Sequence, residues 1–180
     1  HKLTNLHFDP MRMPHECIEP RFVVGKSVTA AFSFAAAMAQ AARVYRRWLP
    51  ARSDQWLQQA MRAYHWALQH LQQYFRQPPD VSTGRYEDSQ GQDDWFWAAL
   101  ELWISTGDRH FQRDALAVED VHYSVPNWCR VATLGLISTA WHAREKAAVD
   151  HLLALAEHLR RQQWLNGERV AMTQADFCWG

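Results

Sequence analysis

Hydrophobic residues along this chain form two kinds of helical pattern, and the two kinds alternate from one segment to the next. In the first kind nearly every face is apolar or small, and a helix without a polar face is buried on all sides. We predict this kind at residues 28–48, 93–105 and 129–143. In the second kind apolar residues recur every three or four positions, which is typical of an amphipathic helix. We predict it at residues 53–75, 109–118 and 145–165, so that six helices form three hairpins.

Polar residues and one glycine mark the ends of several predicted helices. Ser53 or Asp54 can cap the start of the second helix, and Asp93 the start of the third, because short polar side chains accept hydrogen bonds from free backbone N–H groups. Gly107 fits the C-terminal cap of the third helix, and Asp108 fits the N-cap of the fourth.

The links between the predicted helices alternate in length. Links within a hairpin are short, whereas residues 77–92 and 119–128 form long links between hairpins. In a ring of hairpins all long links fall on one face, and long loops on a rigid scaffold are where function usually resides. Three hairpins are half of a six-hairpin toroid, and half a ring leaves a large apolar surface exposed. We therefore expect the remainder of its own domain to be a partner of this chain.

The charge of the chain limits the classes of partner. Nineteen Lys plus Arg balance nineteen Asp plus Glu, so the formal net charge is zero. Without a basic field to hold a phosphate backbone, nucleic acid is not expected as the main partner. The longest uncharged run covers residues 27–42 and is shorter than a membrane span of about 20 residues. We therefore expect no membrane partner.

Tryptophan and cysteine usage leaves more than one interpretation open. The chain contains ten Trp, and flat aromatic rings both fill cores and pack on the faces of sugars. Cys17, Cys129 and Cys178 lack C-x-x-C spacing, and an odd number gives no complete disulfide framework. We expect these cysteines to be buried thiols.

Several separated segments resemble the family 9 glycoside hydrolases. In residues 19–46 an extended run leads into an alanine-rich helix, as in that family. Residues 86–108, YEDSQGQDDWFWAALELWISTGD, resemble the family pattern Y-x-D-x-x-x-x-D-E-x-x-W-A-A-x-E-L-x-x-x-T-G-D. Residues 176–180, DFCWG, resemble D-[FY]-V-W-G, and residues 1–16 resemble the approach to the first segment. The order and spacing of these segments agree over nearly the whole chain.

This resemblance implies an all-α fold, an (α/α)6 toroid of helical hairpins. Residues 1–180 would supply about half of it, as a partial catalytic domain without its N- and C-terminal portions. The implied activity of the parent enzyme is hydrolysis of β-1,4-glycosidic bonds in cellulose or related β-glucan oligosaccharides by an inverting acid/base mechanism. The expected partner is thus a β-linked oligo- or polysaccharide, and no cofactor is required.

The same resemblance places the catalytic residues outside this chain. An inverting mechanism needs an acid and a base whose carboxyl groups lie roughly 6.5–9.5 Å apart. In the family the paired aspartates precede the segment that begins at His1, and the acid glutamate and a histidine–arginine motif follow the segment that ends at Gly180. We therefore expect no catalytic residue here, and the fragment alone is expected to be inactive.

Four loop residues are candidates for sugar binding. In the family a tryptophan at the place of Trp128 stacks on a sugar, and the alternative is a hydrophobic staple at the start of the next helix. Tyr86 and Asp88 lie in the long loop before Asp93, where they can hydrogen-bond sugar hydroxyls, although an Asx turn is the stronger interpretation for Asp88. His122 lies in the loop before Trp128 and can face the same cleft, although a lone loop histidine is more often a surface residue.

Asp93 and Asp94 are the candidate metal ligands, because they match an Asp–Glu pair that helps to bind calcium in some family members. Hard oxygen ligands suit calcium, but Asp94 replaces the glutamate, and N-capping by Asp93 is the stronger interpretation. Without the resemblance, the best acid–base candidates would be the carboxylate pairs Glu87–Asp88 and Glu119–Asp120.

Departures from the family pattern leave the substrate open. Gln92 lies beside the acidic pair, and Cys129 and Arg130 follow Trp128. The nearest competing function is that of an exo-acting β-glucosidase or β-glucosaminidase on short oligosaccharides. A non-catalytic helical interaction scaffold and a different α/α-toroid enzyme also remain open. The resemblance favours a secreted or periplasmic location, while the three cysteines leave a cytoplasmic one open.

Overall fold

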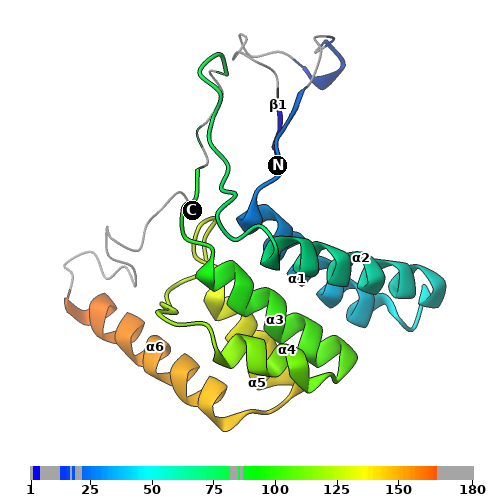
Figure 1. Cartoon of the computed structure of the whole chain (residues 1–180). Helices are drawn as coiled ribbons and strands as arrows, with labels where there is room; N and C mark the ends of the chain where they lie inside the picture. Colours follow the sequence, from blue (N-terminus) through cyan, green and yellow to red (C-terminus); the bar gives the residue numbers. More distant parts are fainter. Residues whose placement is uncertain are drawn as a thin grey trace.

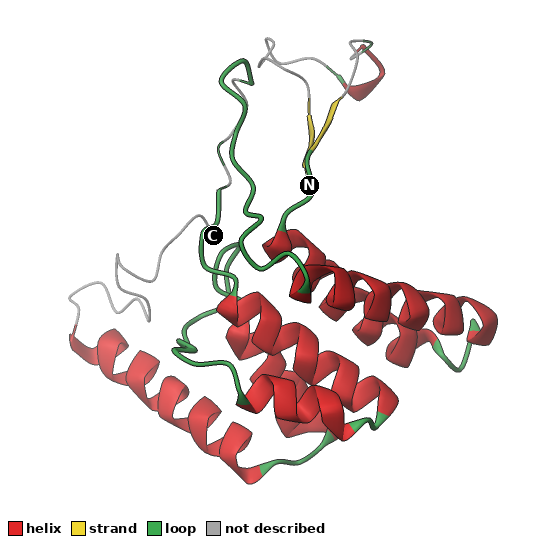
Figure 2. Cartoon of the chain, in the orientation of Figure 1, coloured by secondary structure: helices red, strands yellow, loops and turns green. Residues whose placement is uncertain are grey.

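The computed structural model describes residues 2–4, 13–16, 18, 22–81, 85 and 87–165 of the 180-residue chain. Within these residues it contains six α-helices, one short 3-10 helix and a two-stranded sheet (Figures 1 and 2). The α-helices are α1 (Val28–Tyr45), α2 (Pro50–Leu68), α3 (Gln92–Thr106), α4 (Arg109–Leu116), α5 (Ala132–His142) and α6 (Lys146–Leu165). Each corresponds to a predicted segment, and the all-α class is confirmed.

A small β-hairpin precedes the helices and was not predicted. Strand β1 (Lys2–Thr4) pairs antiparallel with β2 (Phe22–Val24), and the 3-10 helix η1 (Pro14–Glu16) lies between them in the sequence. Strands of three residues are too short to produce a period-two pattern that stands out from chance. Gly25, with a φ of 36°, follows β2 on the way into α1.

The helices form an inner row and an outer row. Inner helices α1 and α3 pack together, as do α3 and α5, while α2, α4 and α6 pack on α1, α3 and α5 respectively. Small residues let the inner helices approach closely, and the core between them is rich in alanine. Its fully buried members include Phe32, Ala35, Ala36, Ala39, Tyr64, Ala98, Ala99 and Leu102. The predicted alternation of inner and outer helices is confirmed.

The predicted caps at the junction of α3 and α4 are confirmed. Gly107 has a φ of 75° in the left-handed region, which favours glycine, and its N–H donates to the carbonyl oxygen of Trp103 across 2.8 Å. Asp108 Oδ1 accepts a hydrogen bond from the backbone N–H of His110 across 2.8 Å. Gly107 and Asp108 therefore form the whole link between α3 and α4.

The start of α2 differs from the prediction. The helix starts at Pro50, so neither Ser53 nor Asp54 caps it. Proline is well suited to the first helical position because its φ is already helical and its missing N–H has no intrahelical partner there. Ser53 is instead buried inside the first turn of α2, and its N–H donates to the carbonyl oxygen of Leu49 across 2.9 Å.

The predicted end of α2 and start of α5 also differ from the structure. Helix α2 ends at Leu68, and the carbonyl oxygen of Gln73 accepts from the N–H of Val28 across 2.8 Å. The segment after α2 therefore satisfies one of the free N–H groups at the start of α1. Helix α5 begins at Ala132 and not at residue 129, because a tight turn precedes it.

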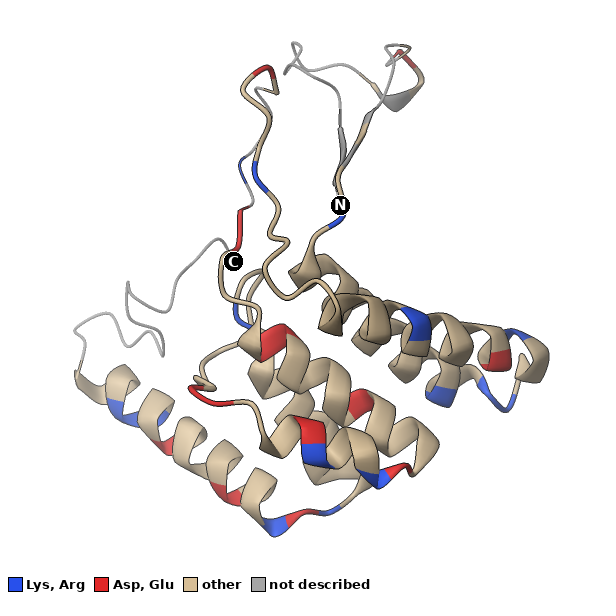
Figure 3. Cartoon of the chain, in the orientation of Figure 1, with Lys and Arg blue, Asp and Glu red and all other residues tan. Residues whose placement is uncertain are grey.

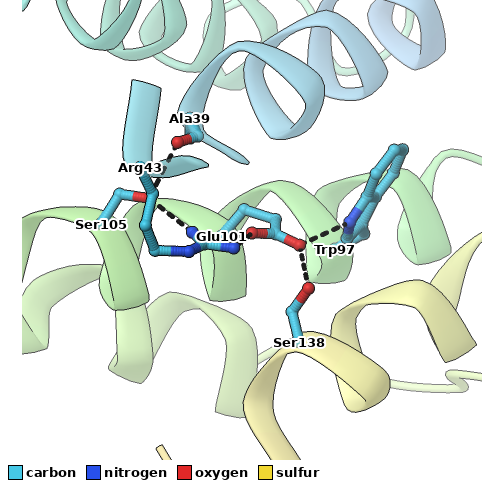
Figure 4. Close-up of polar contacts among 6 residues, drawn as sticks. All are labelled: Ala39, Arg43, Trp97, Glu101, Ser105 and Ser138. Atoms are coloured by element: carbon cyan, nitrogen blue, oxygen red, sulfur yellow. Dashed lines mark hydrogen bonds and ion pairs between the residues drawn. The ribbon is translucent and has the colours of Figure 1, made fainter. Parts of the chain in front are cut away.

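A buried polar network joins the three inner helices (Figure 4). Glu101 of α3 is fully shielded from solvent, and its Oε2 accepts from Arg43 Nη2 of α1 across 2.7 Å. Its Oε1 accepts from Ser138 Oγ of α5 across 2.5 Å and from Trp97 Nε1 across 3.2 Å. Arg43 Nη1 also donates to Ser105 Oγ across 2.6 Å. These bonds satisfy a carboxylate that would otherwise be costly to bury.

The long links gather at one end of the molecule, as predicted. The described residues of the long links, 69–81, 87–91 and 117–131, lie toward the N-terminal ends of α3 and α5. The short links 46–49, 107–108 and 143–145 lie toward the other end (Figure 1). All three inner helices therefore present their N-termini to the same loop face. A site built at this face is held by the three helix starts.

The inner helices also expose apolar side chains, as expected for part of a ring. Phe34 of α1 is 46% exposed, and Ile137 and Trp141 of α5 are 48% and 79% exposed. Acidic and basic residues are interspersed along the outer helices α2, α4 and α6 (Figure 3). No helix in the described ranges is long and apolar enough to cross a membrane.

Candidate functional site

A polar cavity of about 260 Å³ lies between the two long loops of the loop face. It is bordered by the starts of α3 and α5, and it contains charged groups of both signs. Its lining consists of Ser89, Gln90, Gln92, Asp93, Asp120, His122 and Arg130. The structure therefore brings together two of the predicted site residues, His122 and Asp93. His122 is exposed and lies on the cavity wall.

The loop that precedes α3 is held by two carboxylates. Asp88 Oδ1 accepts from the N–H of Gln90 across 2.9 Å, which is the predicted Asx turn. Glu87 Oε1 accepts from the N–H of Gln77 across 2.6 Å, and its carboxylate pairs with Arg85. These bonds to Gln77 and Arg85 lower the pKa of Glu87. Both carboxylates therefore fix the shape of the loop, which argues against Glu87 as a proton donor near neutral pH.

Trp128 lies at the tip of a tight turn directly before α5. The N–H of Asn127 donates to the carbonyl oxygen of Arg130 across 3.0 Å, and Asn127 Oδ1 accepts from the N–H of Cys129 across 3.0 Å. The Trp128 residue remains 38% exposed. A hydrophobic staple needs an apolar residue just before the N-cap, and the residue before the N-cap Val131 is Arg130. The staple interpretation of Trp128 therefore does not fit.

Asp93 connects the starts of two inner helices. It is the second residue of α3, and Gly91 occupies the N-cap without a side-chain bond, so the prediction that Asp93 caps the helix is wrong. Asp93 Oδ2 instead accepts from the N–H of Val131 across 2.7 Å, because this buried N–H at the start of α5 has no partner within its own helix. Burial raises the pKa of Asp93, and the bond from Val131 opposes that rise.

The side chain of Asp94 contacts α1, on the side of α3 opposite to α5. Its Oδ1 accepts from Ser33 Oγ of α1 across 2.5 Å, and burial raises its pKa well above the usual value. Asp93 and Asp94 thus bind opposite neighbours of α3 and do not converge on one ion. Among the described residues, no group of three or more His, Cys, Asp and Glu could hold a metal. The arrangement does not fit a calcium ion shared by the two carboxylates.

Arg130 joins the two loops across the cavity. Its Nη1 donates to Gln90 Oε1 across 2.7 Å, and its positive charge acts to lower the pKa values of Asp88 and Asp93. From the sequence, Arg130 was evident only as a departure from a family pattern, and Gln90 was not predicted to line a cavity. An arginine in one long loop, with an acidic segment in the other, was the available signal.

The remaining candidates from the sequence are the Glu119–Asp120 pair, the cysteines and Tyr86. Asp120 lines the cavity with a φ of 56°, unusual for a residue with a side chain, whereas Glu119 is exposed outside the lining. Cys129 is half-buried, and its Sγ lies 3.3 Å from Asn127 Oδ1. Three further sets of residues lie outside the described part of the chain: Tyr86, Cys17 with Cys178, and the segment 176–180.

The family follows from comparison with known proteins. The sequence profile of glycosyl hydrolase family 9 matches residues 4–179, almost the whole chain. The chain belongs to glycosyl hydrolase family 9. This result confirms the resemblance inferred from the sequence, and it assigns the inner and outer helices to the (α/α)6 toroid expected of that family.

Two curated relatives show how much of the family 9 domain this chain represents. It is 36% identical to a xyloglucan-specific endo-β-1,4-glucanase of Bacteroides ovatus over 86% of this chain and 28% of that protein. It is 27% identical to a cellodextrinase of Butyrivibrio fibrisolvens over 100% of this chain and 37% of that protein. The family 9 chain therefore spans about a third of the length of these relatives.

Solved structures agree with this family 9 fold. A thermostable endoglucanase of Alicyclobacillus acidocaldarius is 30% identical and superposes with a TM-score of 0.87, covering 99% of this chain and 36% of that one. AaCel9A in complex with a cellobiose-like isofagomine is also 30% identical, with a TM-score of 0.88 and the same coverage. The chain thus matches about a third of each of these solved family 9 chains.

Proposed function

We propose that the protein hydrolyses β-1,4-glycosidic bonds in β-glucans, with this chain contributing a substrate-binding loop face. The observation that carries the proposal is Trp128, an exposed ring on a closed turn beside a polar cavity. Flat rings with polar groups nearby suit sugars, which present C–H faces and hydroxyl edges. Family 9 relatives named for endoglucanase, cellodextrinase and xyloglucanase activity support the same substrate class.

In this proposal the acid and the base come from family 9 sequence beyond this chain. Inversion requires two carboxyl groups roughly 6.5–9.5 Å apart with a water between them. Asp93 and Asp94 are buried and bound to Val131 and Ser33, and Asp88 holds a turn. None of these carboxylates is available to activate a water, so the chain alone is expected to be inactive.

The substrate is expected to lie across the loop face, with Trp128 under one sugar ring. Gln92 and His122 are exposed on the neighbouring cavity wall and can bind hydroxyl groups, whereas Asp88 is committed to its turn. A polymeric glucan does not cross a membrane, so the proposal carries a secreted or periplasmic location.

The first test is release of reducing sugar. The chain alone, and the catalytic domain that contains it, would be incubated with cello-oligosaccharides, xyloglucan oligosaccharides and glucosamine oligosaccharides. Release by the complete domain and none by the chain is the expected result, and the preferred sugar defines the substrate. An inert complete domain would refute the hydrolase proposal and leave an interaction scaffold as the better explanation.

A second test examines Trp128 itself in the active domain. Loss of an aromatic contact worth about 0.5–1.5 kcal/mol predicts that Trp128→Ala weakens oligosaccharide binding about 2- to 10-fold. Trp128→Phe retains a flat ring and is expected to lose less. Trp48→Ala is the matched control, because Trp48 is 66% exposed in the short α1–α2 link at the other end. Equal affinities for the Trp128→Ala and Trp48→Ala variants would remove the sugar-stacking assignment.

Short oligosaccharides are the second candidate substrate. The observation behind this candidate is a relative named as a cellodextrinase, which is 27% identical over the whole of this chain. The ratio of the hydrolysis rates on a soluble polymer and on a trisaccharide separates the two. An endo-acting enzyme prefers the polymer, and an exo-acting one prefers the short chain.

A further inference from the structure

The carboxylates at the start of α3 require a positive partner. Asp93 is 6% exposed, and Asp88 lies in the loop just before it. Asp88 is half-buried, and its Oδ1 accepts from the N–H of Gln90 across 2.9 Å. Asp120 adds a third carboxylate to the wall of the same cavity. Asp120 is itself exposed, whereas burying the carboxylate of Asp93 without a compensating partner is strongly unfavourable.

We propose that the guanidinium of Arg130, and not a calcium ion, neutralises these carboxylates and locks the two loops together. Arg130 lines the same cavity as Asp93 and Asp120 and donates from Nη1 to Gln90 Oε1 across 2.7 Å. The N–H of Gln90 in turn binds Asp88. The inference concerns the internal stability of the loop face and stands independently of the hydrolase activity.

The backbone next to Arg130 holds the arginine in this place. The N–H of Val131, the following residue, donates to Asp93 Oδ2 across 2.7 Å in a buried contact. The carbonyl oxygen of Arg130 closes the turn by accepting from Asn127. Arg130 is therefore anchored through its backbone on one side and through Gln90 on the other. A guanidinium is always charged and distributes its charge over several N–H groups, which suits several acceptors around one cavity.

Calcium does not fit the same place. The ion takes about six to eight oxygen ligands, yet Asp94 is bound to Ser33 and one oxygen of Asp93 is occupied by Val131. The charge of Arg130 in the cavity repels a divalent cation. In this proposal Arg130 takes the place of the calcium ion for which Asp93 and Asp94 were the candidate ligands.

The contact between Arg130 and Gln90 also affects Trp128, the candidate sugar-stacking residue, because Arg130 and Trp128 belong to the same four-residue turn. This contact fixes that turn against the loop before α3. The orientation of Trp128 is therefore expected to be independent of calcium.

The test compares the protein with its Arg130→Gln and Arg113→Gln variants, after removal of divalent ions by EDTA. Arg113 is an exposed arginine of α4 away from the cavity, so its substitution controls for the loss of one charge. The Tm of each protein is measured once in EDTA and once in about 10 mM calcium chloride without EDTA. This calcium concentration exceeds the highest dissociation constants common among extracellular calcium sites, about 1 mM. Calcium binding is measured in parallel by isothermal titration.

The unsubstituted protein is expected to bind no calcium and to keep the same Tm in both solutions. Arg130→Gln is expected to lower the Tm in EDTA by about 3 °C, and Arg113→Gln is expected to leave it unchanged. A calcium-dependent rise of the Tm of the unsubstituted protein would overturn the proposal. Equal Tm values for the two glutamine variants would overturn it as well.

A second variant separates charge neutralisation from a general packing defect. Asp88→Asn removes one negative charge and keeps the side-chain oxygen that forms the Asx turn. In the Arg130→Gln background this substitution is expected to restore part of the lost Tm. Additive losses in the double variant would show that Arg130 does not act by neutralising Asp88, and the proposal would fall.

Discussion

Arg43 of α1 donates to the carboxylate of Glu101 in α3 across 2.7 Å, although the Glu101 side chain has no exposed surface. The same carboxylate accepts from Ser138 of α5, so one acidic side chain links all three inner helices (Figure 4). Burying such a pair gains little net free energy, but removing one partner leaves an uncompensated charge inside the protein. The relative positions of the inner helices therefore depend on both members.

Glu101→Gln is expected to lower the free energy of unfolding by about 3 kcal/mol, because Arg43 loses its buried counter-ion. Arg43→Met is expected to lower the free energy of unfolding by at least as much, because it leaves the fully buried carboxylate of Glu101 without its positive partner. The double variant should lose less than the sum of the two, because neither charge then remains alone. Urea denaturation of the four proteins measures the coupling.

Asp150→Asn is the control for the Arg43–Glu101 cycle. It breaks the exposed Lys146–Asp150 pair on α6, whose members are 87% and 56% exposed. Solvent and salt screen such a pair, so the free energy of unfolding is expected to stay nearly unchanged. Strict additivity of the Glu101 and Arg43 substitutions would show that the buried network does not act as a unit.

Gly135→Ala is expected to destabilise the protein, against its effect on helix propensity. Alanine is favoured over glycine inside a helix by about 1 kcal/mol. However, the new Cβ would lie 3.0 Å from Leu100 Cδ1 and 3.3 Å from Trp97 Cα. The second atom belongs to the backbone of α3, so the two helices must separate, at a cost of about 1–3 kcal/mol. A higher Tm for this variant in a thermal melt would show that the α3–α5 contact is looser than these distances indicate.

Asp94 is expected to make the stability of the protein depend on pH. Burial raises its pKa in the folded state well above the value in the unfolded chain, so the folded state holds the proton more strongly. Its contribution is fully present below the ordinary aspartate pKa of about 3.9. That contribution is lost as the pH rises through the raised pKa of the folded state.

The Asp94→Asn variant measures this contribution. An amide cannot ionise, so the decline of Tm with rising pH above 4 is expected to be shallower in the variant than in the unsubstituted protein. The comparison holds salt and buffer constant and follows thermal unfolding between about pH 4 and pH 8. Parallel curves for the two proteins would mean that Asp94 ionises freely in the folded state.

The hydrophobic pattern predicted the helices because apolar residues that recur every three or four positions lie on one face of a helix, and that face is buried. One face of the alanine-rich α1 is buried, whereas its apolar Phe34 is 46% exposed, as expected for part of a ring. Gly107 and Asp108 end and begin helices as their chemistry requires. The errors lie at ends that tertiary contacts decide. Helix α2 ends at Leu68, and beyond it the carbonyl oxygen of Gln73 accepts from the N–H of Val28, a partner distant in sequence.

The candidate site was predicted only in part, for a similar reason. Asp88 follows local turn chemistry, and its Asx turn was predictable from its own loop. Asp93 was misassigned as a cap because its actual partner, the N–H of Val131, lies 38 residues away. The bond from Arg130 to Gln90 spans 40 residues. Opposite charges in two loops indicate that the loops can attract each other, but a single sequence does not specify which atoms pair across such separations.

Asn127 is expected to position Trp128 for sugar binding, if the proposed function holds. Asn127 Oδ1 accepts from the N–H of Cys129 and so closes the turn that presents the ring. Asn127→Ala removes this bond, worth about 1 kcal/mol, and is expected to weaken oligosaccharide binding several-fold in the complete domain. Asn127→Asp keeps a side-chain acceptor for the Asx turn and should bind nearly as well. Equal losses for the alanine and aspartate variants, measured by titration of tryptophan fluorescence, would show that the turn does not orient Trp128.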